Sequence, residues 1–384
     1  MSVRALACTI ADVDLVSALG HAGIRSAVVA RPGTPALYSR YATARVQWAD
    51  PWTEPETLVS RLVEFGSAQP ERPVLYYDAD GDLLVVSRHR QELARAFRFV
   101  VADEGLVEDL VDKSRFQDLA QRLELPLPRG LRIPAGGGLP RVDLRFPLVA
   151  KPLTRNNETW STMASAKAVH VADADALARA HAAFADGGVD VLVQELVPGP
   201  ESRIESYHVY VDEQGAVAAE FTGRKLRTYP SGYGYSTALE LTDARDVVDL
   251  GRALVERLEL TGVAKFDFKR DDDGRLHLLE VNPRFNLWHY PAAVAGLNLP
   301  ALVHADLTGQ PRPPVRHVRG HVRWCSLRHD YPAAKQAGMS TFGWLRWASA
   351  CETKSGFSLR DPLPLPRAVL WRVYSRMRSR ATGG

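Results

Sequence analysis

Residues 263–286, VAKFDFKRDDDGRLHLLEVNPRFN, predict a β-hairpin that carries an acidic pair on one face. An Asp-Gly dipeptide such as 273–274 favours a two-residue turn, which places Asp267 directly opposite Glu280. A four-residue turn would keep both acids on one face, whereas an odd-length turn would weaken the argument. The alternating positions are then expected to form the buried face of the hairpin: Phe266, Phe268, Leu279 and Val281.

Carboxylates that face each other across two strands, about 5 Å apart, repel each other unless a cation lies between them. The same register places Lys265 opposite Asn282, so Asp267, Glu280 and Asn282 offer a set of hard oxygen ligands without Cys or His. Such a set suits Mg2+, with Mn2+ as an alternative, and Mg2+ commonly keeps phosphate oxygens among its remaining ligands. The alternative is a surface hairpin with solvated acids, but Glu280 interrupts an apolar run, where an unpaired carboxylate is costly to desolvate. The hairpin therefore predicts a site for a magnesium nucleotide.

Length and composition predict a folded chain with two or three domains, because 384 residues of which 46% are hydrophobic can bury sizeable cores. The three cysteines, Cys8, Cys325 and Cys351, have no metal-like spacing and cannot all pair within one chain, which favours a reducing compartment. The N-terminal residues lack a signal-peptide core, and no apolar stretch approaches the length of a membrane span. These features predict a cytoplasmic protein.

The first 110 residues predict a small α/β domain. Apolar strands at 6–10, 27–30 and 74–77 alternate with helical spacing at 13–22 and 92–98. The segment has no G-x-G-x-x-G and is therefore not expected to bind a dinucleotide. Its acidic run Asp78, Asp80 and Asp82 lacks the distal Glu of a calcium loop, so an exposed turn is expected there.

A second unit begins near Lys113 and alternates strands with helices in a pattern typical of an α+β sandwich. It contains a buried strand at 146–152 that ends at Lys151, a helix at 174–184, and strands at 191–195 and 206–211. A compact ammonium on a long stem is a good phosphate ligand, although a lone lysine can equally be a solvated surface charge.

The order of these landmarks resembles the ATP-grasp superfamily, and within it the carboxylate–amine ligases related to D-alanine and D-aspartate ligases. The resemblance covers residues 111–310 and implies an ATP-grasp domain with ATP and Mg2+ between two α+β subdomains. Residues 1–110 then form the usual preceding α/β domain, and residues 311–384 a basic C-terminal extension. The expected fold is accordingly α/β and α+β, with several domains.

The resemblance also implies roles for single residues around the nucleotide. Lys113 and Lys151 correspond to the two lysines that hold ATP phosphates. Either Glu201 or Glu205 corresponds to the acid near the ribose. The alternative is that both are surface residues. The segment that resembles the adenine-binding hinge, and that could otherwise be an ordinary strand end, comprises Gln194, Glu195, Leu196 and Val197.

The candidates for catalytic residues that the resemblance implies are four cations: Arg224, Lys225, Lys265 and Arg284. The first two are expected to face phosphate or the substrate carboxylate, and the last two to stabilise the developing oxyanion. Residues 220–227 resemble the Gly-Arg-Lys segment of these ligases, although a basic strand edge also discourages aggregation. At position 265 the ligases usually carry an arginine, where this chain has Lys265. Lysine keeps the positive charge but lacks the paired N–H donors with which a guanidinium makes two hydrogen bonds at once. Residues 228–237, TYPSGYGYST, place Gly232 and Gly234 between aromatics, as a mobile lid or an ordinary exposed loop would.

The reaction implied is ATP-dependent ligation of a small-molecule carboxylate, such as an amino acid, to an amine through an acyl phosphate, with release of ADP and phosphate. Rival readings are a small-molecule kinase, another acyl-phosphate ligase, and a non-catalytic ATP-binding regulatory protein. His208 and His289 are candidates for substrate contact, although a lone histidine is more often structural. A homodimer is also expected.

The C-terminal tail, residues 312–384, differs in net charge from the rest of the chain. Residues 312–384 carry 14 Lys or Arg and 3 Asp or Glu, a net charge of +11, which leaves −8 for the rest of the chain. Residues 365–384 predict a basic helix that could contact an anionic membrane surface peripherally, or an acidic carrier. The alternative is that the tail's four tryptophans pack against the preceding domain while its arginines face water. No motif converts this charge into nucleic-acid binding.

Overall fold

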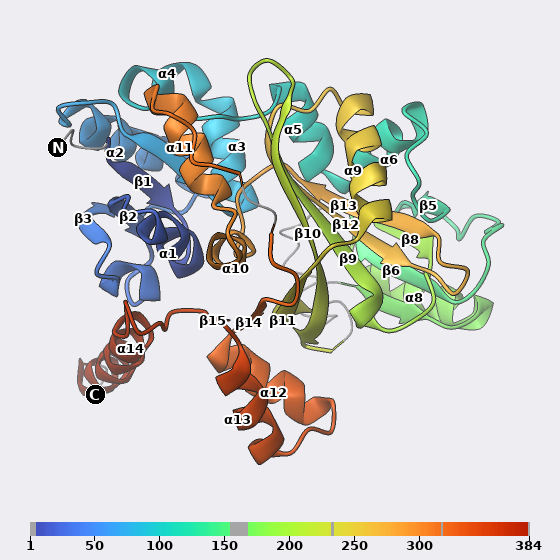
Figure 1. The fold of residues 1–384 in the computed structure, drawn as a ribbon. Helices are drawn as coiled ribbons and strands as arrows, with labels where there is room; N and C mark the ends of the chain where they lie inside the picture. Colours follow the sequence, from blue (N-terminus) through green and yellow to red (C-terminus); the bar gives the residue numbers. More distant parts are fainter. Residues whose placement is uncertain (1–4, 154–167, 232–233, 316–317, 383–384) are drawn as a thin grey trace.

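A four-stranded parallel sheet forms the N-terminal part of the protein (Figure 1). The computed structural model describes residues 5–153, 168–231, 234–315 and 318–382. The strands, in the order β3-β2-β1-β4, are β1 (Ala7–Ile10), β2 (Ser26–Ala30), β3 (Ala42–Gln47) and β4 (Val74–Tyr77). The helices of this part are α1 (Val13–His21), α2 (Pro55–Ser67), α3 (Asp80–Arg88), α4 (Arg90–Ala96) and α5 (Glu104–Val111). The central strands are buried on both faces, as in other α/β sheets.

The acidic run after β4 is not the exposed turn that the sequence predicted. Asp80 begins helix α3, and Asp82 is buried with 6% of its surface exposed. The Asp78 carboxylate accepts a hydrogen bond of 2.8 Å from the backbone N–H of Asp12. The error arises because β4 leads almost directly into a helix, and acids are as favourable in a first helical turn as in an exposed loop.

A second four-stranded sheet is antiparallel, with the order β5-β8-β6-β7. Phe184 and Leu177 of the covering helix pack into its core. The elements of this part are α6 (Lys113–Arg122), β5 (Gly130–Ile133), β6 (Leu148–Pro152), β7 (Val169–Val171), α8 (Ala174–Asp186) and β8 (Val191–Glu195).

The largest sheet has seven strands in the order β13-β12-β9-β10-β11-β14-β15. Helix α9 (Arg245–Arg257) covers one face, where Tyr207 packs closely against Gly251. The strands are β9 (Ile204–Val211), β10 (Val217–Tyr229), β11 (Tyr235–Thr242), β12 (Gly262–Arg270), β13 (Leu276–Asn282), β14 (Arg323–Cys325) and β15 (Thr353–Lys354).

The β12–β13 hairpin has the predicted register at its acidic end but not the predicted turn. Asp267 pairs with Glu280 and Lys265 with Asn282. The five residues between the strands, 271–275, are instead closed by a 2.9 Å hydrogen bond from the Asp271 N–H to the Arg275 carbonyl. This leaves a three-residue turn with Gly274 at φ 83°, in the left-handed region that such a turn requires. A bulge after Asp267 compensates for the odd loop length, since the register shifts by one residue there.

The bulge also changes the buried face of the hairpin. Phe266, Phe268 and Val281 are buried as predicted, but Leu278 takes the place expected for Leu279 and is fully buried. Leu279 is only partly buried. The two acids thus share a face although the turn between them is odd.

The C-terminal extension adds two strands to the large sheet and reaches back to the N-terminal domain. Trp324 Nε1 and Ser355 Oγ donate hydrogen bonds of 2.9 and 2.7 Å to the two carboxylate oxygens of Asp14 on α1. Desolvation raises the pKa of Asp14 to about 7. The remaining helices are α10 (His289–Ala295), α11 (Leu299–Thr308), α12 (Leu327–Gln336), α13 (Thr341–Ala350) and α14 (Pro364–Thr382).

Helices α12 and α13 are fastened to the large sheet by a buried ion pair. Arg227 on β10 donates two hydrogen bonds, of 2.8 and 2.7 Å, to the carboxylate of Asp330, which is fully buried. Trp344 Nε1 donates a third, of 2.9 Å, and Trp347 lies 4.0 Å from the Arg227 guanidinium. Trp344 and Trp347 thus pack against the preceding domain, which was one of the two alternatives for the tail.

Candidate functional site

Asp267 is the centre of a buried cluster of charges on one face of the large sheet. Its carboxylate is 1% exposed and accepts hydrogen bonds of 2.8 Å from both Lys225 and Lys265 on one oxygen. Its other oxygen accepts a hydrogen bond of 2.5 Å from Ser206 on β9. The strand register brings these residues together, because Asp267 pairs with Ser206 on one side and with Glu280 on the other.

Glu280 forms the open side of the cluster. Its side chain is 46% exposed, and Lys265 lies 3.6 Å from its carboxylate. Asn282 Nδ2 donates a hydrogen bond of 3.1 Å to Glu280 Oε1. The expectation that the apolar run buries Glu280 is therefore wrong, since β13 is an edge strand of the sheet and its Glu280 side chain is partly accessible.

The charges of the cluster balance, which determines the protonation of its members. Desolvation raises the pKa of Asp267, but the two lysines outweigh it and hold that pKa well below its usual range. Desolvation likewise opposes ionisation of Glu280, yet Lys265 and Lys225 keep its pKa below normal. Both acids are thus ionised at neutral pH, and their formal charges equal in number those of Lys225 and Lys265.

Lys151 belongs to the second sheet but lies within electrostatic range of Glu280. Desolvation lowers the pKa of Lys151, while the Glu280 carboxylate raises it. Its ammonium donates a hydrogen bond of 3.1 Å to Gln194 Oε1. Lys113 donates one of 2.7 Å to the carbonyl of Pro152, the residue after Lys151. The two predicted phosphate-binding lysines thus come to the same end of β6.

Arg284 connects the end of the hairpin to the N-terminal domain. Its guanidinium donates hydrogen bonds of 2.6 Å to Asp80 and 2.7 Å to the carbonyl of Asp78. A third, of 3.3 Å, goes to Asn282 Oδ1. Arg284 therefore lies beside the predicted metal ligands and forms an ion pair with Asp80 of the N-terminal domain.

The structure does not bring Arg224 and Glu205 to this face. Neighbouring residues of a strand point to opposite sides, so Arg224 lies on the other face from Lys225 and approaches Glu240 at 3.4 Å. Glu205 lies on that same face, with Arg270 at 3.9 Å. Glu201 is placed differently: it accepts a hydrogen bond from Thr228 and raises the pKa of Lys225. Of the two acids proposed for the ribose, Glu201 is the one near the cluster.

The hinge and lid segments flank the same region. Gln194 is buried at the end of β8, Glu195 accepts a hydrogen bond of 3.0 Å from the Arg145 N–H, and Leu196 N–H donates one of 3.0 Å to Pro147. Val197 is also buried. Gly232 of the expected lid lies outside the described residues. At Gly234, a Cβ would lie 2.1 Å from the carbonyl oxygen of Pro230, so no other residue fits that turn.

The two candidate histidines are packed away from solvent. His208 and His289 are fully buried, and neither ring has a hydrogen-bond partner within the part of the chain that the structure describes. His208 stacks on Phe221 at 4.4 Å. Desolvation lowers the pKa of both rings, that of His289 to about 3, so both are neutral at physiological pH. In this conformation neither ring is exposed to a substrate.

Two contributions to the site were missed in the sequence. Ser206 fixes the orientation of Asp267, but the pairing of β9 with β12 joins strands far apart in the chain and has no local signal. Asp80 binds Arg284 across two domains. A signal for Asp80 existed, because an acidic run directly after an apolar strand is typical of the carboxyl edge of a parallel sheet.

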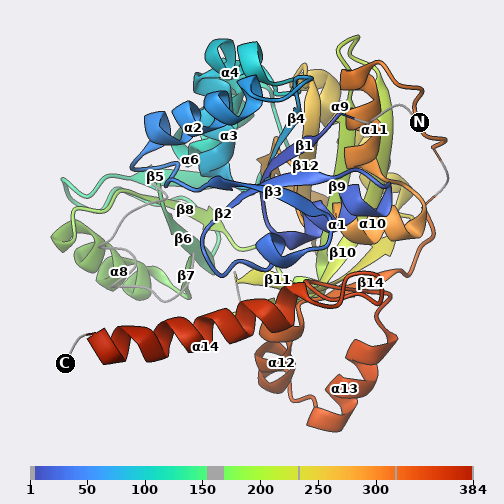
Figure 2. The ribbon, with the colours of Figure 1, turned by 90° about the vertical axis from the view of Figure 1, so that its left-hand side faces the viewer.

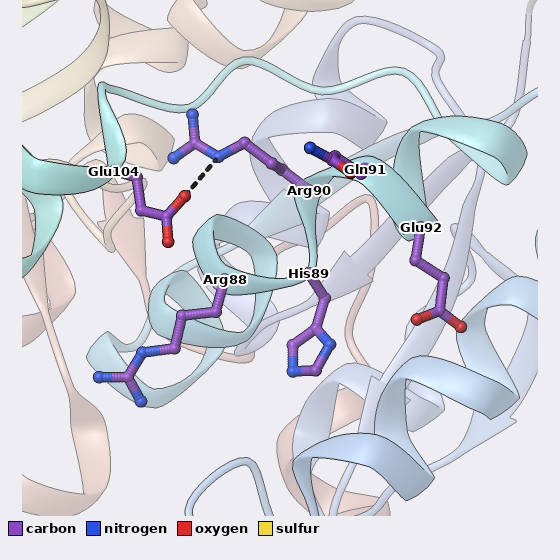
Figure 3. A pocket seen from close by; sticks show the side chains of 6 residues that line it. All are labelled: Arg88, His89, Arg90, Gln91, Glu92 and Glu104. Carbon is purple, nitrogen blue, oxygen red and sulfur yellow. Dashed lines mark ion pairs between the residues drawn. The ribbon is translucent and has the colours of Figure 1, made fainter.

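A small pocket in the N-terminal domain lies apart from this cluster (Figure 3). It measures about 210 Å³ and is lined by the junction of α3 and α4 together with Glu104 of α5. Its walls are polar, and Arg90 lies 3.9 Å from Glu104. None of the predicted site residues lines it.

Comparison with known proteins identifies the fold around the charged cluster. A family model described as ATP-grasp in the biosynthetic pathway with Ter operon matches residues 188–328, which include β8 to β14 and the whole cluster. This chain contains an ATP-grasp domain. The resemblance to the ATP-grasp superfamily and the predicted fold class are confirmed, and residues 7–77 supply the parallel sheet that precedes the ATP-grasp sheets.

Curated relatives of this ATP-grasp chain include two kinds of ligase. It is 26% identical over 264 residues to a D-aspartate ligase of Enterococcus faecium (strain Aus0004), covering 65% of this chain and 62% of that protein. It is 28% identical over 208 residues to a D-alanine–D-alanine ligase of Pseudomonas fluorescens (strain Pf0-1), covering 51% and 62%. The chain thus spans less than two thirds of the length of either relative.

Solved structures show the same fold over most of the chain. An ADP complex of N5-carboxyaminoimidazole ribonucleotide synthetase aligns with a TM-score of 0.63 at 13% identity, covering 88% of this chain and 87% of that one. An L-amino acid ligase from Bacillus licheniformis aligns with a TM-score of 0.60 at 16% identity, covering 81% and 75%. At these identities the likeness establishes the ATP-grasp fold alone.

Proposed function

We propose that this protein is an ATP-dependent carboxylate–amine ligase. The observation that carries the proposal is the balanced cluster of Asp267, Glu280, Lys225 and Lys265, with Lys151 of the second sheet in electrostatic range of Glu280. A largely buried, charge-balanced group of this kind is costly to build, and well-packed hydrophobic residues would often stabilise a fold as well or better. It provides cations for a polyphosphate and carboxylates for the metal ion that accompanies it.

The nucleotide is proposed to lie between the second sheet and the large sheet. Lys151 and Lys113 would bind its phosphates, and the hinge 194–197 would hydrogen-bond adenine through backbone groups. Glu201 is our choice for the ribose, because it lies near Lys225 whereas Glu205 lies on the opposite face of β9. Lysine binds phosphate as a point charge, so these contacts need no fixed fork geometry.

The residues at the hairpin suit Mg2+, with Mn2+ as an alternative. Glu280 and Asn282 offer oxygen ligands on the partly accessible side of the cluster, and Asp267 offers a third on the same face. Mg2+ bound there would neutralise charge on the phosphates of ATP. Asp267 would then share its oxygens between the metal and the hydrogen bonds that it accepts here from Lys225, Lys265 and Ser206.

The reaction proposed has two steps. A carboxylate oxygen of the first substrate attacks the γ-phosphorus of ATP, which gives an acyl phosphate and ADP. The amine of the second substrate attacks the acyl carbon, loses a proton to solvent, and expels phosphate to leave an amide. Lys225, Lys265 and Arg284 would stabilise the negative charge that develops on the transferred phosphoryl group and on the tetrahedral oxyanion.

The substrate class follows from the relatives rather than from a pocket. Their names specify D-aspartate, D-alanine and L-amino acids as substrates of those proteins, and we propose that an amino acid is one substrate here. The residues that select the second substrate are not assigned, because specificity in such sites depends on a few side chains.

The decisive experiment is a phosphate-release screen with Mg-ATP, in which amino acids and other carboxylates are crossed against amines. A ligase releases ADP and phosphate together and requires both an acid and an amine. A kinase forms ADP with a single acceptor and releases no phosphate. ATP binding without turnover across the screen would favour the regulatory reading and contradict the proposal.

The balanced charges also predict how the metal binds. We expect Mn2+, used as a paramagnetic reporter for Mg2+, to bind the protein alone more than tenfold more weakly than it binds with a non-hydrolysable ATP analogue present. The reason is that Lys225 and Lys265 cancel the attraction of the two carboxylates until phosphates engage those lysines. The measurement is the signal of free Mn2+ in electron paramagnetic resonance, corrected for Mn2+ bound by the analogue alone. Tight Mn2+ binding to the protein without nucleotide would contradict this account.

A further inference from the structure

Within the part of the chain that the structure describes, the C-terminal extension holds most of the exposed large hydrophobic side chains. Among the described residues, 17 large hydrophobic side chains are exposed, and 13 of them lie after residue 310, in about a fifth of the chain. Figures 1 and 2, which differ by a rotation about the vertical, both place α12, α13 and α14 along the lower side of the molecule. Exposed apolar side chains gathered on one side of a protein mark an interaction surface.

Helix α14 is apolar on the face that points away from the protein. Its packed face repeats every three to four residues through Pro364, Ala368, Trp371 and Ser375, of which Pro364 and Ala368 are buried and Trp371 keeps 37% of its surface exposed. The Trp371 ring lies against the backbone of Gly33. The opposite face, which a surface helix normally fills with polar residues, carries Val369, Leu370, Val373, Tyr374 and Met377, all of them exposed.

Arginines border this apolar face on both sides. The helical period places Arg367 and Arg378 along one border, and Arg372 and Arg376 along the other. Residues 362–384 contain five arginines and no acid. The apolar stripe is strongly exposed, with 68% of Leu370 and 66% of Met377 accessible. An apolar stripe between rows of arginine is typical of helices that lie in the interface of an anionic bilayer.

We propose that α14 docks this protein on an anionic phospholipid surface, with the helix axis parallel to the bilayer. Its outward apolar face would enter the boundary between headgroups and acyl chains, while the flanking arginines contact lipid phosphates. None of the helices in the described part of the chain is long and apolar enough to cross a membrane, so the contact is peripheral. Figure 2 shows α14 running along the lower side of the molecule beside α12, and the side chains of its outer face are exposed.

The charge and polarity of α14 favour an anionic bilayer over two other binding partners, a second copy of the chain and a nucleic acid. A second copy of the chain would bring five more arginines against the first five, which disfavours pairing of two α14 helices. A nucleic-acid backbone would satisfy the arginines but would leave the apolar stripe between them in water. An anionic bilayer matches both features of the helix.

The test is co-sedimentation of the full chain with vesicles of phosphatidylcholine alone and of phosphatidylcholine mixed with phosphatidylglycerol. We expect binding to the mixed vesicles only, weakened by added salt. Replacing Arg367, Arg376 and Arg378 together with Gln should weaken binding about 100-fold, since each arginine near an anionic surface contributes about fivefold. The matched control replaces three exposed arginines elsewhere, Arg95, Arg179 and Arg275, and should have little effect.

A second variant tests the apolar face. Replacing Leu370, Val373 and Met377 with Gln should weaken binding by about tenfold or more while leaving the circular dichroism spectrum unchanged, because these side chains are exposed. The control carries Leu139→Gln and Val217→Gln, at exposed apolar positions outside the extension.

The proposal would be overturned if the protein bound neither kind of vesicle, or bound both equally. It would also be overturned if the control variants bound vesicles as weakly as the α14 variants do, or if the protein bound duplex nucleic acid more strongly than vesicles. A concentration-dependent dimer in sedimentation equilibrium that the apolar variant abolishes would also overturn it, because the face would then be an interface between copies.

Discussion

The Glu280→Gln variant is expected to form ADP at least about 10²-fold more slowly than the parent protein, with its stability nearly unchanged. Gln keeps the size of the side chain and can still accept a hydrogen bond from Asn282, but it removes the negative charge on the accessible side of the cluster. The side chain is 46% exposed, so the pair with Lys265 is screened by solvent. We therefore expect the free energy of unfolding to change by no more than about 0.5 kcal/mol.

The measurement is the steady-state rate of ADP formation with the best substrate pair, together with urea unfolding at neutral pH. Asp273→Asn is the matched control, because it neutralises an exposed acid at the turn of the same hairpin, far from the cluster. If Glu280 is a metal ligand, the variant should also need a higher Mg2+ concentration for half-maximal rate. Turnover equal to that of the parent would refute the assignment of Glu280.

The acidic end of the hairpin could be predicted from the sequence because its pattern is local. Two strands joined by a short turn have few possible registers, and alternation assigns Asp267 and Glu280 to one face. The odd turn would have moved them apart, and the bulge that compensates for it was not predicted. The register was thus correct although one of its premises, the two-residue turn, was wrong.

Contacts between distant segments could not be predicted in this way. Lys225 and Ser206 reach Asp267 only because β10, β9 and β12 are neighbours in the sheet, and strand order has no local signal. The resemblance to the ligases nominated Arg224 and Lys225 together, although consecutive residues of a strand face opposite sides. Alternation alone would have separated Lys225 from Arg224.

The buried partner of the lysines should matter for folding as well as for activity. Asp267→Asn is expected to lower the free energy of unfolding by about 3 kcal/mol at neutral pH, because it leaves two largely buried ammonium groups without their counterion. Asn preserves the shape and can still accept a hydrogen bond from Ser206, so the effect isolates the charge. The same variant should lose ADP formation, since it also removes a proposed metal ligand.

The pH dependence of this stabilisation follows from the direction in which folding shifts the pKa of Asp267. The pKa of Asp267 is lower in the folded protein than in the unfolded chain, where it is near 3.8, so the carboxylate stabilises the fold above that value. This stabilisation is lost as the pH falls below about 4, where the unfolded chain binds the proton first. The difference in stability between parent and Asp267→Asn should therefore be full at neutral pH and should shrink below about pH 4.

A charge-compensated double variant separates electrostatics from packing. Adding Lys225→Met to Asp267→Asn removes one of the two uncompensated ammonium groups and keeps most of the side-chain volume. We expect this second change to restore part of the lost stability, measured by urea unfolding, without restoring ADP formation. If the double variant is as unstable as the sum of its single changes, Asp267 does not act as the counterion of these lysines. The balanced cluster would then not explain the stability of this face of the sheet.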